Sequence, residues 1–123
     1  MWSSKEPVTE NMLHKPIYDE LKRLAKRQAT TTYGAIAPLA ALEMDNPPDR
    51  EEMRQILGKI STYEHQHKRP MLSAIVVYKQ ENIPGPGFFE LARHLGLLSE
   101  GNEELSFFCQ EVTRVYAAWK GAD

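Results

Sequence analysis

The sequence predicts a mostly helical α+β fold, a winged-helix-like domain with an added C-terminal helix. Three segments carry apolar residues at helical spacing: 15–28, 49–67 and 103–120. Residues 72–78 form a continuous apolar, β-branched run, which is typical of a strand buried on both faces. A turn rich in proline and glycine, residues 79–87, follows that strand and leads into a short helix.

The composition favours one globular domain. The chain has 123 residues, of which 41% are hydrophobic and 26% charged, with a net charge of −2. A single cysteine, Cys109, excludes an intrachain disulfide framework and fits a reducing, cytoplasmic setting. No apolar run approaches the ~20 residues of a membrane span, and the N-terminus lacks the apolar centre of a signal peptide. We therefore expect a cytoplasmic protein that does not bind a membrane.

The first half of the chain should begin with an irregular segment, residues 1–14. The helix at 15–28 then opens with Pro16 in its first turn, where a missing N–H costs nothing. One face of this helix is predicted to be buried, and the other is basic. The predicted buried face consists of Ile17, Leu21, Leu24, Ala25 and Gln28, and the basic face of Lys22, Arg23, Lys26 and Arg27.

The threonines at 30–32 can cap a second, short helix over residues 33–43. A proline-containing linker at 45–48 ends it. The third helix is expected over 49–67, with Asp49 and Glu52 as a capping box.

After the strand at 72–78, Gly85 or Gly87 should adopt a positive φ in the turn. A fourth helix follows over 88–95, with Gly96 as a left-handed C-cap.

The last helix should carry a long apolar stripe that packs on the domain or on a partner. Asn102 can cap its N-terminus, and Cys109 lies on the stripe, where a buried structural thiol is the usual case. The stripe consists of Leu105, Phe108, Cys109, Val112, Val115, Tyr116 and Trp119.

The segment Thr31-Thr32-Tyr33-Gly34-Ala35-Ile36-Ala37 resembles the start of the helix-turn-helix in O6-alkylguanine-DNA alkyltransferases and alkyltransferase-like proteins. The resemblance covers residues 31–87. Leu57-Gly58 is similar to the family's helix glycine, and residues 70–73 stand where the family has its Pro-Cys-His-Arg active site. The glycine turn is matched by Gly85 and Gly87. The resemblance implies a winged-helix DNA-binding domain.

The chain departs from the family at the residues that carry its chemistry. Met71 stands in place of the nucleophilic cysteine, and Leu72 in place of the histidine. Alkyl transfer needs an activated thiolate, so we expect no enzyme activity. Gln55 stands where the family has its base-displacing arginine, with Arg54 beside it.

The predicted function is non-catalytic binding of nucleic acid, with double-stranded DNA as the partner. Helix 49–67 and the turn at 79–87 would form the contact. Phosphate binding depends on lysine and arginine, and residues 1–69 carry 11 of these against 10 acidic residues, whereas residues 70–123 carry 4 against 7. The predicted contacts are Thr32, Tyr33, Arg54, Gln55, Lys59, Lys68, Arg69 and Lys79.

The alternative is a protein-interaction module, an adaptor or an inhibitor, that uses the turn at 84–89 and helix 103–120. Phe88 and Phe89 would then contact the partner, although such a pair is more often core. His65 and His67 point about 200° apart on a helix and cannot bind one ion there, so no metal or other cofactor is expected. The sequence makes no prediction of the oligomeric state.

Overall fold

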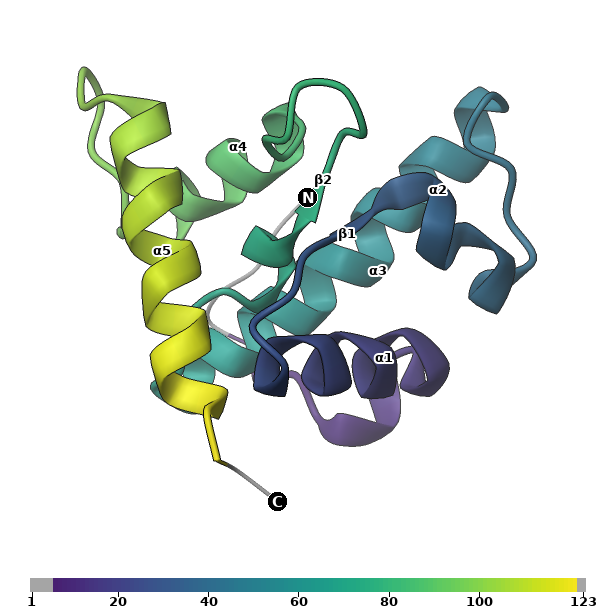
Figure 1. Ribbon diagram of the computed structural model, residues 1–123, viewed down its shortest axis with the longest axis horizontal. Coiled ribbons are helices and arrows are strands. Elements are labelled where there is room, and N and C mark those ends of the chain that lie inside the picture. Colours follow the sequence, from purple (N-terminus) through teal and green to yellow (C-terminus); the bar gives the residue numbers. More distant parts are fainter. Residues whose placement is uncertain (1–5, 122–123) are drawn as a thin grey trace.

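The computed structural model describes residues 6–121, which form a mostly helical fold with one small sheet (Figure 1). This confirms the α+β prediction at that level. The α-helices are α1 (Lys15–Lys26), α2 (Tyr33–Ile36), α3 (Pro47–Gln66), α4 (Pro86–His94) and α5 (Glu104–Trp119). The 3-10 helices are η1 (Glu10–Met12), η2 (Ala37–Ala40) and η3 (Leu72–Ile75), and the strands are β1 (Thr31–Thr32) and β2 (Val76–Val77).

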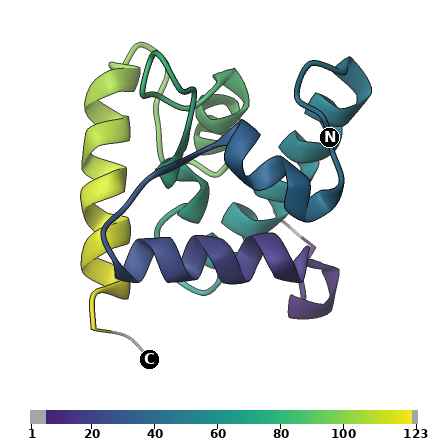
Figure 2. The same cartoon turned by 45° about the vertical axis from the view of Figure 1, so that its right-hand side comes forward.

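The centre of the fold is η3, which contacts α1, α3 and α5. All four of its residues are buried. Figures 1 and 2 show α1 and α5 along two sides of the molecule, and in Figure 1 α3 runs behind α2 and β1. A single cluster of buried apolar side chains joins all these elements, so the described part of residues 15–123 shares one core.

The prediction of a strand over 72–78 is largely wrong. Only Val76 and Val77 are in a strand, and the preceding four residues form the turn η3. The apolar run is buried as predicted, but three helices enclose it instead of neighbouring strands. A short apolar run cannot by itself distinguish a strand from another buried segment.

The sheet is a two-stranded parallel pair, in which Thr31 lies opposite Val76 and Thr32 opposite Val77. Parallel strands need a long crossover connection, and α2, η2 and α3 supply it. The pairing fixes the start of α2 beside the chain that enters the 79–87 segment, although Thr32 and Val76 are 44 positions apart in the sequence.

The second and third helices differ from the prediction in where they begin or end. The second helix covers only 33–36 as an α-helix and continues as η2, which ends where Ala41 adopts a φ of 57°. The third helix begins two residues earlier than predicted, at Pro47, after the N-cap Asn46. Asp49 accepts a hydrogen bond from the Glu43 N–H at 2.9 Å and forms no capping box with Glu52.

Of the remaining predictions about helix ends, one is confirmed and three are wrong. Gln28 lies beyond α1 with a φ of 59° and is exposed, so it is not part of the buried face. The fourth helix begins at Pro86, before the predicted start, whereas Gly96 has the expected positive φ of 81°. The N-cap of α5 is Glu103 instead of Asn102.

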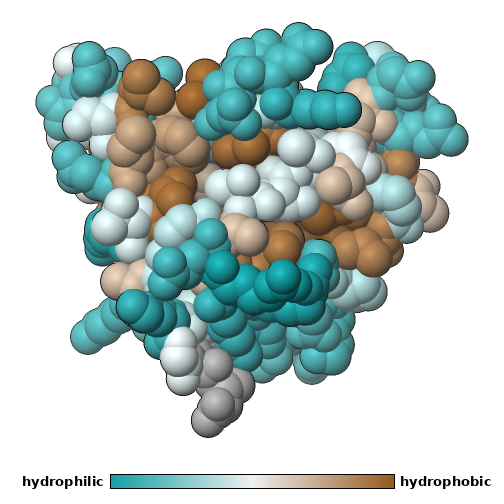
Figure 3. All heavy atoms as spheres, viewed as in Figure 1, coloured by the Kyte–Doolittle hydropathy of each residue, from teal (hydrophilic) through white to brown (hydrophobic). Residues whose placement is uncertain are grey.

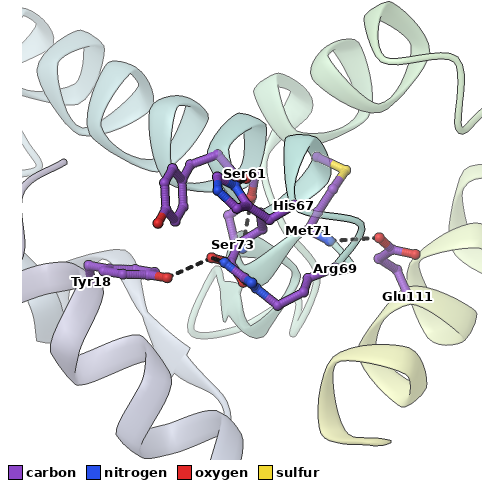
Figure 4. A network of polar contacts seen from close by, with 9 residues as sticks. Tyr18, Ser61, His67, Arg69, Met71, Ser73 and Glu111 are labelled. Atoms are coloured by element: carbon purple, nitrogen blue, oxygen red, sulfur yellow. Dashed lines mark hydrogen bonds and ion pairs between the residues drawn. The ribbon is translucent and has the colours of Figure 1, made fainter. Parts of the chain in front are cut away.

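The apolar stripe of α5 is only partly buried. Phe108 and Val115 are in the core, but Leu105 and Cys109 are exposed, so the prediction of a buried thiol is wrong. In contrast, Glu111 is only 1% exposed. Its Oε2 accepts a hydrogen bond from the buried N–H of Met71 at 2.8 Å, which ties α5 to the chain entering η3 (Figure 4).

A second buried carboxylate, Glu64 of α3, joins α3 to α1. It accepts a hydrogen bond from the Tyr18 hydroxyl at 2.7 Å and one from Arg69 Nε at 2.8 Å (Figure 4). Burial raises the pKa of Tyr18, and the neighbouring carboxylate raises it further. The same carboxylate raises the pKa of Arg69. The Arg69 guanidinium also lies 5.8 Å from the ring centre of Trp119.

The Gln66 side chain of α3 holds the start of the described N-terminal segment by two hydrogen bonds. The Gln66 amide donates to the Glu6 carbonyl at 2.9 Å and accepts from the Val8 N–H at 2.8 Å. Residues 6–14 therefore have fixed contacts and include η1, where the sequence predicted no regular element. The first five residues of the predicted irregular segment lie outside the described residues.

Candidate functional site

A cleft of about 610 Å³ lies between α2, the first half of α3 and the segment from Tyr78 to α4. Most of its lining is apolar. In the view of Figure 3 the surface over α1 is hydrophilic, whereas apolar residues are visible across the part formed by α4, β2 and α3. Residues from distant parts of the chain line the cleft, among them Thr32, Tyr33, Arg54, Ser73, Tyr78 and Lys79.

Tyr33 connects the two sides of the cleft. Its hydroxyl accepts a hydrogen bond from the Gly85 N–H at 2.8 Å, and its ring centre lies 5.1 Å from that of Tyr78. The preceding residue, Thr32, holds the start of α2 because its Oγ1 accepts from the Ala35 N–H at 3.1 Å. The Thr-Tyr-Gly sequence thus both caps a helix and positions an aromatic ring.

The prediction of a positive φ at Gly85 or Gly87 is wrong. Gly85 has a φ of −74°, and neither residue is among those with positive φ. Both are needed for close approach instead. A Cβ added at Gly85 would lie 2.6 Å from the Tyr78 hydroxyl, and one at Gly87 would lie 2.9 Å from Cδ of Arg54. Glycine therefore lets two long side chains pack directly against the backbone of this turn.

Burial raises the pKa of Tyr33 to about 12. An unfolded tyrosine ionises near pH ~10, so between about pH 10 and 12 the unfolded chain releases a proton that the folded chain keeps. We expect the free energy of unfolding to fall over this window as the pH rises. Chemical denaturation at several pH values should show that fall, and Tyr33→Phe should show a smaller one. An identical decline in the variant would contradict the assignment to Tyr33.

The charges around the cleft are mixed. Arg54 pairs with Glu51 at 3.1 Å and lies 3.9 Å from Glu90. The hydrogen bond with Arg54 lowers the pKa of Glu51. Arg50 donates to the Met44 carbonyl, and Lys79 is exposed. The cleft therefore has cations at its edge, but one of these cations, Arg54, already has carboxylate partners.

The structure brings together half of the predicted nucleic-acid contacts. Thr32, Tyr33, Arg54 and Lys79 line the cleft, whereas the other four lie elsewhere. Gln55 donates to Glu51 at 2.7 Å, and Lys59 is exposed farther along α3.

The remaining two predicted contacts, Lys68 and Arg69, follow the C-terminal end of α3. At 1.5 Å per residue, that end lies roughly 18 Å along the helix axis from Arg54. Phe88 and Phe89 are 6% and 5% exposed. They are core residues, which leaves little of either ring for contact with a partner protein.

Two serines that were not among the predicted site residues lie beneath the cleft. Ser73 is one of its lining residues, and Ser73 Oγ is 2.6 Å from Ser61 Oγ (Figure 4). The Ser73 N–H also donates to Ser61 Oγ at 3.0 Å. Met71 and Leu72, which stand at the family's nucleophile and base positions, are both completely buried and are not among the cleft residues.

No family model matches this chain, and no curated protein or solved structure shows significant similarity to it. Over residues 6–121, no three histidine, cysteine or acidic side chains are grouped in a way that could hold a metal ion. None of the helices in the same range is both long and apolar enough to cross a membrane. The assignment of function therefore depends on the cleft and its surroundings.

Proposed function

We propose that this chain is a non-catalytic, winged-helix-like protein that binds nucleic acid in a cytoplasmic setting. The first half of α3, the N-terminus of α2 and the 79–87 segment would form the contact surface. The observation that carries the proposal is the convergence of Thr32, Tyr33, Arg54 and Lys79 on one cleft. The resemblance of residues 31–87 to the alkyltransferase-like proteins adds support, and duplex DNA is the first ligand to test.

The cations near the cleft limit how strong the electrostatic attraction can be. Arg50 and Lys79 are exposed and lie at its edge, whereas Glu51, beside Arg54, would repel phosphate. We therefore expect a small number of phosphate contacts and a moderate dependence of affinity on salt.

The proposal predicts that duplex DNA binds at low salt and that charge reversal at Arg50 or Lys79 weakens binding. Each lost phosphate contact should reduce the slope of log affinity against log salt by about 1. Fluorescence anisotropy with a labelled duplex at several salt concentrations measures both quantities. Lys120→Glu is the matched control, because Lys120 is an exposed cation at the end of α5. A flat salt response, or no complex at micromolar protein, would rule the proposal out.

We also expect no transfer of an alkyl group from O6-alkylguanine DNA to the protein. Met71 has no nucleophilic atom of the required kind and is completely buried. Cys109 is exposed on α5 but is not among the residues that line the cleft. Intact-protein mass spectrometry after incubation with such DNA should show an unchanged mass. A stable adduct on Cys109 would overturn this expectation.

A second candidate, a protein-interaction module, is favoured by one observation on α5. Leu105 is 55% exposed, the largest exposed fraction among the exposed large hydrophobic side chains of the described residues. The burial of Phe88 and Phe89 shifts this candidate from the 84–89 turn to α5 alone. It predicts no DNA complex, and loss of a partner protein on Leu105→Asp, whereas Lys79→Glu should leave that partner bound.

A further inference from the structure

Ser61 and Ser73, the two serines beneath the cleft, carry two hydroxyl protons, but only one of these protons has an acceptor among the described residues. Ser61 Oγ accepts the N–H of Ser73, and one hydroxyl proton lies between the two oxygens. The second hydroxyl proton has no acceptor among the described residues. If it belonged to Ser61, which is 0% exposed, an unsatisfied donor would be buried in the core. The less costly arrangement has Ser61 donating to Ser73, so that the spare proton belongs to the residue that lines the cleft.

The hydroxyl of Tyr33, on another side of the cleft, also accepts one hydrogen bond and has a proton with no acceptor in the described part of the chain. Its oxygen accepts from the Gly85 N–H, and within residues 6–121 its own proton has no acceptor. Burial raises its pKa to about 12, so the phenol keeps that proton at neutral pH. The cleft therefore has two hydroxyl donors, each with its oxygen already engaged, in a lining that is otherwise mostly apolar.

We infer that the cleft is a binding site for a neutral, planar small molecule whose edge carries a hydrogen-bond acceptor, which the hydroxyls of Tyr33 and Ser73 bind. The rings of Tyr33 and Tyr78 supply flat apolar surface beside the donors. Most of the lining is apolar, which favours a neutral ligand inside the cleft, whereas the cations Arg50 and Lys79 lie at its edge. The volume is ample for a small molecule.

This site shares the cleft and Tyr33 with the proposed nucleic-acid contact, but its test is separate because it concerns the free protein and a small ligand. A failure to bind DNA would leave it standing, and a failure here would leave the DNA contacts of Arg50 and Lys79 standing. The two proposals also differ in their readouts, since a neutral ligand held by hydroxyls should bind with little dependence on salt.

The test compares two bicyclic probes of similar size at neutral pH. Quinoline carries a ring nitrogen that accepts a hydrogen bond, whereas indole carries an N–H that donates one. NMR titration of the full chain should show quinoline binding about tenfold more tightly than indole. Quinoline can accept one hydrogen bond from a cleft hydroxyl, whereas the N–H of indole would face a hydroxyl that also donates. The shifted amide signals should include those of residues 32–34 and 73, and the signals of α5 should stay in place.

Variants then assign the preference to the hydroxyls. Ser73→Ala and Tyr33→Phe should each reduce the ratio of the two affinities, and the double variant should bring it close to one. Ser106→Ala, at an exposed serine on α5, is the control and should leave the ratio unchanged. Equal affinities in the unaltered protein, a preference that survives the double variant, or no saturable binding would each overturn the inference. If a variant does not fold, the inference is tested by which amide signals shift when quinoline binds the unaltered protein. Shifts that do not include residues 32–34 and 73 would overturn it.

Discussion

Replacing Arg69 with leucine should lower the free energy of unfolding by about 3 kcal/mol. Glu64 is 0% exposed and depends on two partners, the Tyr18 hydroxyl and the Arg69 guanidinium. Removing the cation leaves a carboxylate in the core with one neutral donor, and such an uncompensated buried charge typically costs about 3–5 kcal/mol. The lower end of that range applies because the Arg69 side chain is itself 34% exposed, so water reaches the pair from one side.

Chemical denaturation of two further variants makes this prediction specific. Lys59→Ala removes an exposed cation from the same helix and should change stability by less than about 0.5 kcal/mol. Combining Arg69→Leu with Glu64→Gln removes the buried charge, so the double variant should be more stable than Arg69→Leu alone. If the double variant is less stable, the cost does not come from an unpaired carboxylate.

The role of Arg69 changes how nucleic-acid experiments should be designed. Its position after α3 made it a predicted phosphate contact, but its guanidinium is held by Glu64 and is packed near Trp119. Charge reversal at Arg69 would weaken any binding indirectly, by destabilising the folded protein. Arg50 and Lys79, which have no such partner in the core, are the informative positions.

The helices could be predicted from the sequence because their apolar residues repeat over many turns. The segment from Leu72 to Val77 could not, because its six buried residues show no period and their neighbours come from three different helices. The two turn glycines were correctly identified as special but for the wrong reason. Close approach of the Tyr78 and Arg54 side chains depends on tertiary structure and leaves no local signal.

Only the part of the candidate site that lies within one short sequence motif could be predicted. Thr32 and Tyr33 were among the predicted site residues because threonines can cap a helix and because residues 31–37 resemble the start of the alkyltransferase helix-turn-helix. The buried carboxylates were missed, although a signal existed. Glu64 continues the spacing of Met53, Ile56, Leu57 and Ile60 on α3. A charged residue at a core position requires a partner, so this spacing could have indicated that a nearby cation is structural.

The same reasoning gives a second large effect, at Glu111 of α5. This carboxylate is 1% exposed and has two partners of unequal value: the buried N–H of Met71 and the Arg114 guanidinium, whose side chain is 60% exposed. An exposed ion pair contributes less than about 1 kcal/mol, whereas a buried N–H left without an acceptor costs about 1–3 kcal/mol. The hydrogen bond to Met71 should therefore account for most of the stabilisation.

Two substitutions at Glu111 separate these contributions. Glu111→Gln keeps an oxygen acceptor for the Met71 N–H and loses only the ion pair, so its free energy of unfolding should fall by less than about 1 kcal/mol. Glu111→Leu fills similar space but leaves that N–H unpaired, and its stability should fall by about 2–3 kcal/mol. Equal losses in the two variants, measured by chemical denaturation, would assign the effect to Arg114 instead. The predicted difference would mean that α5 is fixed to the domain through the backbone that enters η3, so the C-terminal helix is an integral part of the fold that shapes the cleft.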